Sequence, residues 1–171
     1  PGDPLLERII PPGTGPREKR TFSSVWQAAH MMKALAYLGY SRDDPLVEKG
    51  AAYIFNNQNK TGSWSPGKDA YGDNPGAELQ PIYTAVILQS LALAGYGMTT
   101  EALLGYSWLT AFRLTDGAWP AGVVEGNYRG IAGYRRLPHS QFGCRTTTTA
   151  AAAALAYHPE MCHGEEVKKA L

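Results

Sequence analysis

The chain has 171 residues, of which 44% are hydrophobic and 18% charged, and its formal net charge is +1. This composition is typical of a folded domain and excludes a disordered chain, while the near-zero charge argues against a nucleic-acid partner. No apolar run reaches the length of a transmembrane helix, and two cysteines are too few for a disulfide scaffold. We therefore expect a cytoplasmic protein, with peripheral membrane association as an alternative.

The first hairpin follows a segment rich in proline, glycine and charge, residues 1–21, which is predicted to be a linker or N-terminal extension. Apolar residues then recur at helical spacing from Phe22 until Gly39, a residue that typically follows a helix C-terminus. A second, shorter helix is predicted to begin after Asp44 as N-cap and to end near Asn56. The pattern predicts an αα-hairpin.

The same plan recurs twice along the chain. An almost wholly apolar helix is predicted from Pro81 to Gly95, followed by a helix capped by Thr99 or Thr100. A third apolar helix is expected from about Thr147, and HGEEVKKAL begins its partner. Residues 22–171 are thus predicted to form one repeat domain, truncated at its C-terminus because the third repeat is incomplete.

Five pairs of like residues lie 55 positions apart, which identifies the repeat: Gly50 and Gly105, Tyr53 and Trp108, Ile54 and Leu109, Gly62 and Gly117, Trp64 and Trp119. Alternating apolar and amphipathic helices predict two layers, with the apolar helices inside. A Trp that follows a Gly after each outer helix can fold back over the seam between hairpins. We expect the glutamine of the motif to cap the end of the outer helix.

The motif resembles the QW repeat of squalene-hopene and oxidosqualene cyclases. Its slots are filled by Lys49, Gly50, Tyr53, Ile54, Gln58, Gly62 and Trp64. The second copy departs from the pattern, with Leu104 for the basic residue and Arg113 for the glutamine. The resemblance, to the superfamily of terpenoid cyclases and protein prenyltransferase β-subunits, implies an all-α fold of αα-hairpins arranged as part of an α/α toroid, here about three hairpins.

The resemblance does not assign a catalytic residue. Class II terpene cyclases use an Asp-x-Asp-Asp acid, which this chain lacks, and Asp43-Asp44 is interpreted as a helix cap. Catalytic residues therefore stay unknown. If the protein is an enzyme, a cyclase or isomerase-like or prenyltransferase-like activity is implied, with key residues outside this chain.

Aromatic residues suggest a site for an apolar, isoprenoid-like ligand at the N-terminal pole of the inner helices. The ligand-binding candidates, from the inner helices and two long loops, are Trp26, His30, Tyr71, Tyr83, Tyr128, Tyr134, Phe142 and Arg145. Arg145 belongs to an arginine group, with Arg129, Arg135 and Arg136, that could bind an anion. The alternative is ordinary loop packing with solvated arginines, and we expect His30 to be a histidine packed in the core.

The resemblance to prenyltransferase β-subunits implies a zinc ion bound by an Asp, a Cys and a His. His139 and Cys144 are the metal candidates, and Asp69, Asp73 and Glu78 could complete the set. His158, Cys162 and His163 form a separate group, because a helix of about 1.5 Å per residue would hold Cys144 and His158 nearly 20 Å apart.

Two other functions fit a helical repeat. One is a non-catalytic scaffold that binds a protein or peptide through its loops, and the other is a polysaccharide lyase that would use Tyr134, Arg136 and His139. A complement-type thioester domain is excluded because Gly143-Cys144 continues as Arg-Thr-Thr. A homo-oligomer, or the remainder of a longer chain, would be needed to close a ring.

Overall fold

The computed structural model describes residues 24–65, 80–122 and 134–164. These residues form α2 (Ser24–Tyr37), α3 (Pro45–Asn56), α4 (Pro81–Leu93), α5 (Thr100–Ala111), α6 (Arg145–Tyr157) and the short 3-10 helix η3 (Met161–His163). Within these three ranges there is no strand, only isolated bridges between Pro120 and Gly143 and between Arg136 and Cys144. The predicted all-α class is confirmed.

The turns inside the first two hairpins are the same Schellman motif. Gly39 after α2 and Gly95 after α4 both have φ of +89°. In each turn the following tyrosine donates its backbone N–H five residues back, Tyr40 to Leu35 and Tyr96 to Leu91. A positive φ of this size suits glycine, so the predicted helix ends are confirmed.

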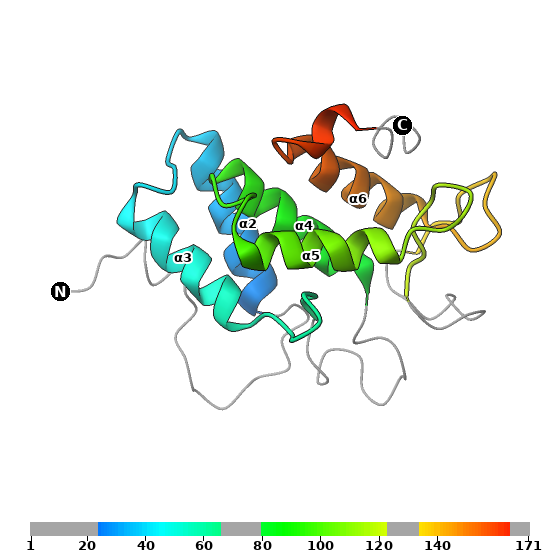
Figure 1. Ribbon diagram of the computed structural model, residues 1–171, viewed down its shortest axis with the longest axis horizontal. Coiled ribbons are helices and arrows are strands. Elements are labelled where there is room, and N and C mark those ends of the chain that lie inside the picture. The colour runs from blue at the N-terminus through cyan, green and yellow to red at the C-terminus, as the bar shows by residue number, and fades with distance from the viewer. Residues whose placement is uncertain (1–23, 66–79, 123–133, 165–171) are drawn as a thin grey trace.

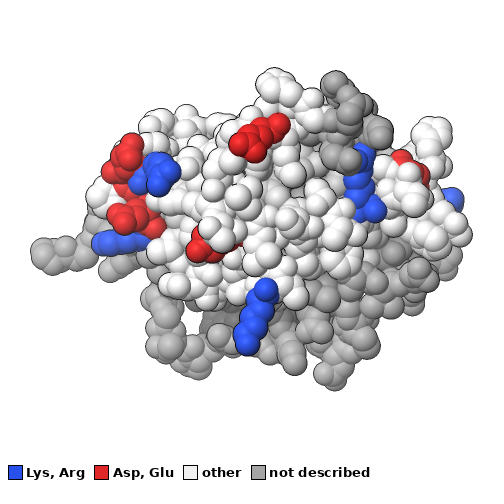
Figure 2. All heavy atoms as spheres, viewed as in Figure 1, with Lys and Arg blue, Asp and Glu red and all other residues white. Residues whose placement is uncertain are grey.

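Side-chain caps start the two outer helices at the predicted residues. The carboxylate of Asp44 accepts the backbone N–H of Leu46 at 2.8 Å, and Thr99 Oγ1 accepts that of Ala102 at 3.3 Å. Figure 2 shows that charged side chains gather at the left of this view, over the turn between α2 and α3, where Asp44 lies. The acidic pair therefore includes a helix cap, as predicted.

The helices form two layers (Figure 1). The inner helix α4 packs between α2 and α6, while α3 packs against α2 and α5 against α4, crossing in front of it in this view. No helix of the described residues is long and apolar enough to cross a membrane. The alternation of inner and outer helices is the layering of an α/α toroid, as predicted from the repeat.

Trp64 fills the seam between the first and second hairpins. Its side chain is 1% exposed, and its Nε1–H donates to the carbonyl of Ile54 at the end of α3 at 2.8 Å. Its backbone N–H donates to Thr84 Oγ1 in α4 at 3.1 Å. A Cβ atom on Gly105 of α5 would lie 2.9 Å from Cζ3 of Trp64, so glycine is required for this approach. Burying such a side chain contributes on the order of 4–6 kcal/mol.

Trp119 makes the same contacts at the next seam. Its Nε1–H donates to Leu109 O at 2.8 Å, and its backbone N–H donates to Thr148 Oγ1 in α6 at 3.0 Å. Arg113, which replaces the glutamine of the motif, donates from Nε to the carbonyl of Gly117 and places its guanidinium 5.3 Å from the centre of the indole ring. The predicted staple is confirmed in both copies.

Gln58 does not cap its own helix as expected. Its Nε2 donates to the carbonyl of Gly62 and to that of Glu101 in the first turn of α5, both at 2.8 Å. The reason is the turn at Gly62, whose φ of +96° brings the chain back beneath the glutamine. The amide therefore joins two hairpins instead of completing one helix.

The first turn of α6 begins at Arg145, two residues before the predicted start. Contacts with other segments hold this turn, since Cys144 donates its backbone N–H to Trp119 O and Arg145 donates its own to Arg135 O. The threonine run, which by propensity alone disfavours a helix, is thereby accommodated. Of the helix expected over 163–171, the described residues include only its first two, and the short turn η3 ends at His163.

A buried histidine lies where α6 ends. His158 Nδ1 accepts the backbone N–H groups of Glu160 and Met161, both at 3.1 Å, and its ring meets that of Tyr106 edge to face at 4.5 Å. The Tyr106 hydroxyl in turn donates to Ala154 O. Burial lowers the pKa of His158 below its ordinary value, although the charge of Glu160 opposes this shift.

Candidate ligand-binding face

The inner helices turn one side away from α3 and α5, which we call the inner face. Equivalent positions on this face follow from the repeat. Helices α2 and α4 are offset by 56 residues, as Gly39 and Gly95 show, and α4 and α6 are offset by 64, as the seam threonines Thr84 and Thr148 show. Unlike the buried positions that face the outer helices, most of these residues are half-buried or exposed. In four successive levels they are Trp26, Ile82 and Thr146; His30, Val86 and Ala150; Lys33, Gln89 and Ala153; Tyr37, Leu93 and Tyr157.

Aromatic rings gather at the end of this face nearest the N-termini of the inner helices. The rings of Trp26 in α2 and Tyr83 in α4 have centroids 4.5 Å apart, and those of Trp26 and His30 are 5.1 Å apart. Tyr83 is buried and Trp26 half-buried. The structure thus brings together three of the predicted ligand-binding residues, which we call the aromatic end.

His30 is not a core histidine, so that expectation was wrong. The residues of α2 that pack in the core are Val25, Ala28, Ala29, Met32 and Leu35, and His30 lies on the other side of the helix, exposed on the inner face. Partial desolvation lowers the pKa of His30 below its ordinary value, and the positive charge of Lys33 one turn away lowers it further.

Polar groups gather about two to three turns further along the inner face, a feature that sequence reasoning missed. Lys33 Nζ donates to Gln89 Oε1 at 2.9 Å and lies 6.0 Å from the centre of the Tyr37 ring. A hydrogen-bonding interaction with Tyr37 is the main cause that raises the pKa of Tyr157. We call these four residues, from three helices, the polar end. The sequence signal that could have indicated the polar end is Lys33, the one lysine in an otherwise apolar helix, which the repeat aligns with Gln89 in the next inner helix.

Two predicted aromatics, Tyr134 and Phe142, pack elsewhere. They are half-buried against a small second cluster of Ala121 and Cys144, close to the start of α6. The bridges between Pro120 and Gly143 and between Arg136 and Cys144 hold this loop against the end of the second seam.

The Cys144 thiol lies at the N-cap position of α6 and is 1% exposed. Burial raises its pKa, but hydrogen bonds from the backbone of Arg135, Thr147 and Thr146 and from the Thr147 hydroxyl outweigh that effect. The resulting pKa is below the ordinary value for a cysteine. Neither this cysteine nor Cys162 forms a disulfide.

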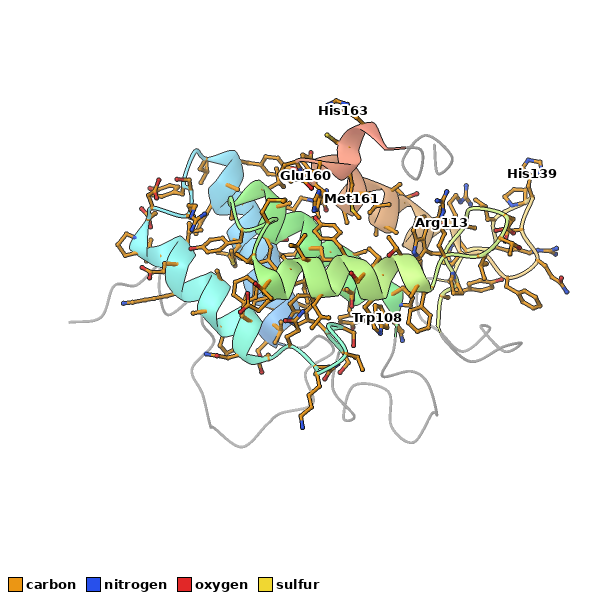
Figure 3. The ribbon with its side chains drawn as sticks, viewed as in Figure 1. Trp108, Arg113, His139, Glu160, Met161 and His163 are labelled. Carbon is orange, nitrogen blue, oxygen red and sulfur yellow. The ribbon has the colours of Figure 1, made fainter. Side chains whose placement is uncertain are left out.

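The described residues do not form a metal site. In the ranges 24–65, 80–122 and 134–164, no three His, Cys, Asp or Glu side chains gather closely enough to hold an ion. His139 is exposed and projects from the end of the molecule, far from His163 (Figure 3). A zinc site at His139 and Cys144 therefore stays a prediction that needs Asp69, Asp73 or Glu78, which lie outside the described residues.

Comparison with known families decides the relationship. A family model described as the squalene-hopene cyclase C-terminal domain matches residues 21–143. The chain belongs to this family. Among curated proteins, none matches the chain. The terpenoid cyclase-like toroid expected from the QW motif is thereby confirmed.

The match to the squalene-hopene cyclase C-terminal domain includes both seam tryptophans and the aromatic end. It stops just before Cys144, yet α6 continues the inner layer beyond it and supplies Thr148 to the second seam. The domain family accounts for the architecture. It does not assign an activity to this chain, which contains no Asp-x-Asp-Asp sequence.

The remaining candidates of this cyclase-like domain lie in or beside its long loops. Arg145, Arg135 and Arg136 are exposed around the start of α6, where Arg145 donates its backbone N–H to Arg135 O at 2.7 Å. Three of the predicted arginines are therefore neighbours, although an anion site there stays a prediction. The other candidates, Tyr71, Tyr128 and Arg129, lie outside the described residues.

Proposed function

We propose that the inner face of this terpenoid cyclase-like domain binds an apolar, isoprenoid-like ligand. The observation that carries the proposal is the aromatic end, where Trp26 packs against His30 on its own helix and against Tyr83 on the neighbouring inner helix, with the rings tilted to one another. Aromatic faces bind unsaturated hydrocarbon and stabilise positive charge. The proposal assigns ligand binding to this chain and assigns no general acid.

The apolar row beside the aromatic end supports the same proposal. Ile82, Val86 and Leu93 of α4 are half-buried, although α4 lies between two other helices. Ala150 and Ala153 continue this surface on α6 with small side chains. A ligand that covered these residues would remove apolar surface from water, at about 25 cal/mol per Å².

A binding measurement with matched tryptophan variants tests the proposal. The probe is farnesene, and the dissociation constant is measured by isothermal titration calorimetry for the unaltered chain, Trp26→Leu and Trp108→Leu. Trp108 is the control, because it is also half-buried and packed at a tilt against an aromatic ring, that of Phe112 at 4.4 Å between centroids, but lies on the outer helix α5 (Figure 3).

We expect Trp26→Leu to weaken farnesene binding by about 3–10-fold, since one aromatic contact contributes about 0.5–1.5 kcal/mol. Trp108→Leu should leave the dissociation constant within about twofold. Equal affinities of all three proteins would place the ligand away from the inner face. Absence of binding to the unaltered chain would overturn the proposal and favour the scaffold alternative.

A further inference from the structure

The polar end of the inner face has an unusual charge environment. None of the residues of α2, α4 or α6 is Asp or Glu, and apart from Arg145, the first residue of α6, Lys33 is their one Lys or Arg. Lys33 is half-buried, between the amide oxygen of Gln89 and the ring of Tyr37. No carboxylate on these three helices therefore balances its charge.

Tyrosine hydroxyls from α2 and α6 complete the polar end around this ammonium group. Tyr157 of α6 lies at the same level of the inner face as Tyr37 of α2, one turn beyond Lys33, and both Tyr37 and the charge of Lys33 affect its pKa. Lys33 has three N–H donors and Gln89 takes one of them. Tyr37 and Tyr157 are 61% and 42% exposed, so their hydroxyls can be reached from the inner face.

An amphipathic ligand would suit the distance between the two ends. Lys33 lies seven residues after Trp26 along the helix, a rise of about 10 Å, and Tyr37 lies eleven residues after it, a rise of about 16 Å. Half-buried apolar residues occupy the intervening places on α4 and α6. A ligand with its hydrocarbon part at the aromatic end would therefore present its other end to Lys33.

We propose that Lys33, Gln89, Tyr37 and Tyr157 form a subsite that binds the carboxylate of an otherwise apolar, isoprenoid-like ligand. One ammonium group balances one carboxylate, and the phenol hydroxyls can donate to its oxygens. A diphosphate would bring several negative charges to a single positive one. The subsite deepens the proposed function and rests on it, because it requires the hydrocarbon part to bind along the inner face.

The test compares farnesoic acid with its methyl ester, which has the same hydrocarbon chain without the charge. Dissociation constants are measured for the unaltered chain, Lys33→Met, Tyr157→Phe and the control Lys49→Met, which alters an exposed lysine on the outer helix α3. Lys33→Met removes the ammonium group but keeps an unbranched side chain that reaches as far as the lysine Cε, and Tyr157→Phe changes only a hydroxyl on an exposed ring. Circular dichroism at 222 nm checks that each variant is folded.

We expect the unaltered chain to bind the acid about 10-fold or more tightly than the ester, since charge-assisted hydrogen bonds are the strong ones. Lys33→Met should abolish this preference and leave the affinity for the ester within about twofold. Tyr157→Phe should reduce the preference about threefold, and Lys49→Met should retain it.

The outcomes separate this subsite from the proposed function. Tight binding of both ligands without preference would overturn the subsite and leave the proposed function standing. A preference that survives in Lys33→Met would place the carboxylate elsewhere and also overturn the subsite. Tighter binding of farnesyl diphosphate than of farnesoic acid would refute the matching of single charges. Absence of binding by the acid and the ester would overturn both proposals.

Discussion

The free-energy cost of placing a side chain between the closely packed hairpins at Gly62 can be measured with one pair of substitutions. Gly39 and Gly62 have nearly the same backbone conformation, with φ of +89° and +96°. Their surroundings differ, because a Cβ on Gly39 would meet nothing within 4 Å, whereas one on Gly62 would lie 2.6 Å from the carbonyl oxygen of Leu104. Alanine at both positions therefore separates the cost of the conformation from the cost of the contact.

The expected free energies follow from these two terms. An alanine at positive φ costs about 1–2 kcal/mol, and the loss of glycine's freedom in the unfolded chain returns about 0.4–1 kcal/mol. Gly39→Ala should therefore lower the free energy of unfolding by about 1 kcal/mol. Gly62→Ala carries the same two terms and must also displace a backbone carbonyl in α5, at about 1–3 kcal/mol more. Its total loss should be about 2–4 kcal/mol.

Urea denaturation followed by circular dichroism at 222 nm gives both values, provided that the slope with urea is unchanged. Fluorescence provides a second probe, since the buried Trp64 lies two residues after Gly62. The decisive quantity is the difference between the two variants, in which the unfolded-state terms cancel. Equal decreases in the free energy of unfolding would refute the reasoning, because they would show that the hairpins move apart at Gly62 at no cost in free energy.

Two further predictions concern buried groups. Trp64→Phe and Trp119→Phe should each lower the free energy of unfolding by about 1–3 kcal/mol, because each removes a buried hydrogen bond of 2.8 Å from an indole Nε1 and leaves part of the space of the larger ring unfilled; a loss in urea denaturation confined to one seam would contradict their equivalence. The pKa of His158 is lower in the folded protein than in the unfolded chain, so the unfolded chain binds more protons as the pH falls. The contribution of His158 to the free energy of unfolding is therefore complete above a pH of about 6.5 and declines as the pH falls below that value. His158→Gln should flatten this decline relative to the control His163→Gln, and unchanged slopes in both variants would exclude His158 as its cause.

The two-layer fold could be predicted because its seams depend on local, repeated chemistry. Each seam needs a glycine at positive φ and a tryptophan two residues later, and this pattern is visible in a single sequence. The Schellman turns at Gly39 and Gly95 are local in the same sense. What could not be predicted is the partner across the seam, such as Thr84 or the carbonyl of Glu101, because those contacts depend on how hairpins stack.

The candidate site was only partly predictable for a related reason. Aromatic residues indicate a binding face by their type, so Trp26 and Tyr83 could be named in advance. Lys33 and Gln89 acquire meaning only through their alignment on neighbouring helices, where they form a hydrogen bond across 56 residues. His30 shows the opposite error, because an apolar helix has one side outside the core, and its sequence alone does not say which.

The two seam threonines have a consequence for how such proteins can vary. Trp64 is 20 residues from Thr84, whereas Trp119 is 29 residues from Thr148, yet both pairs make the same hydrogen bonds. The intervening segment can therefore lengthen by nine residues without disturbing the junction that it connects. Insertions and deletions in these segments leave the packing of the helices at the seam unchanged. New binding residues can therefore arise in these segments while the two-layer arrangement of the helices is kept.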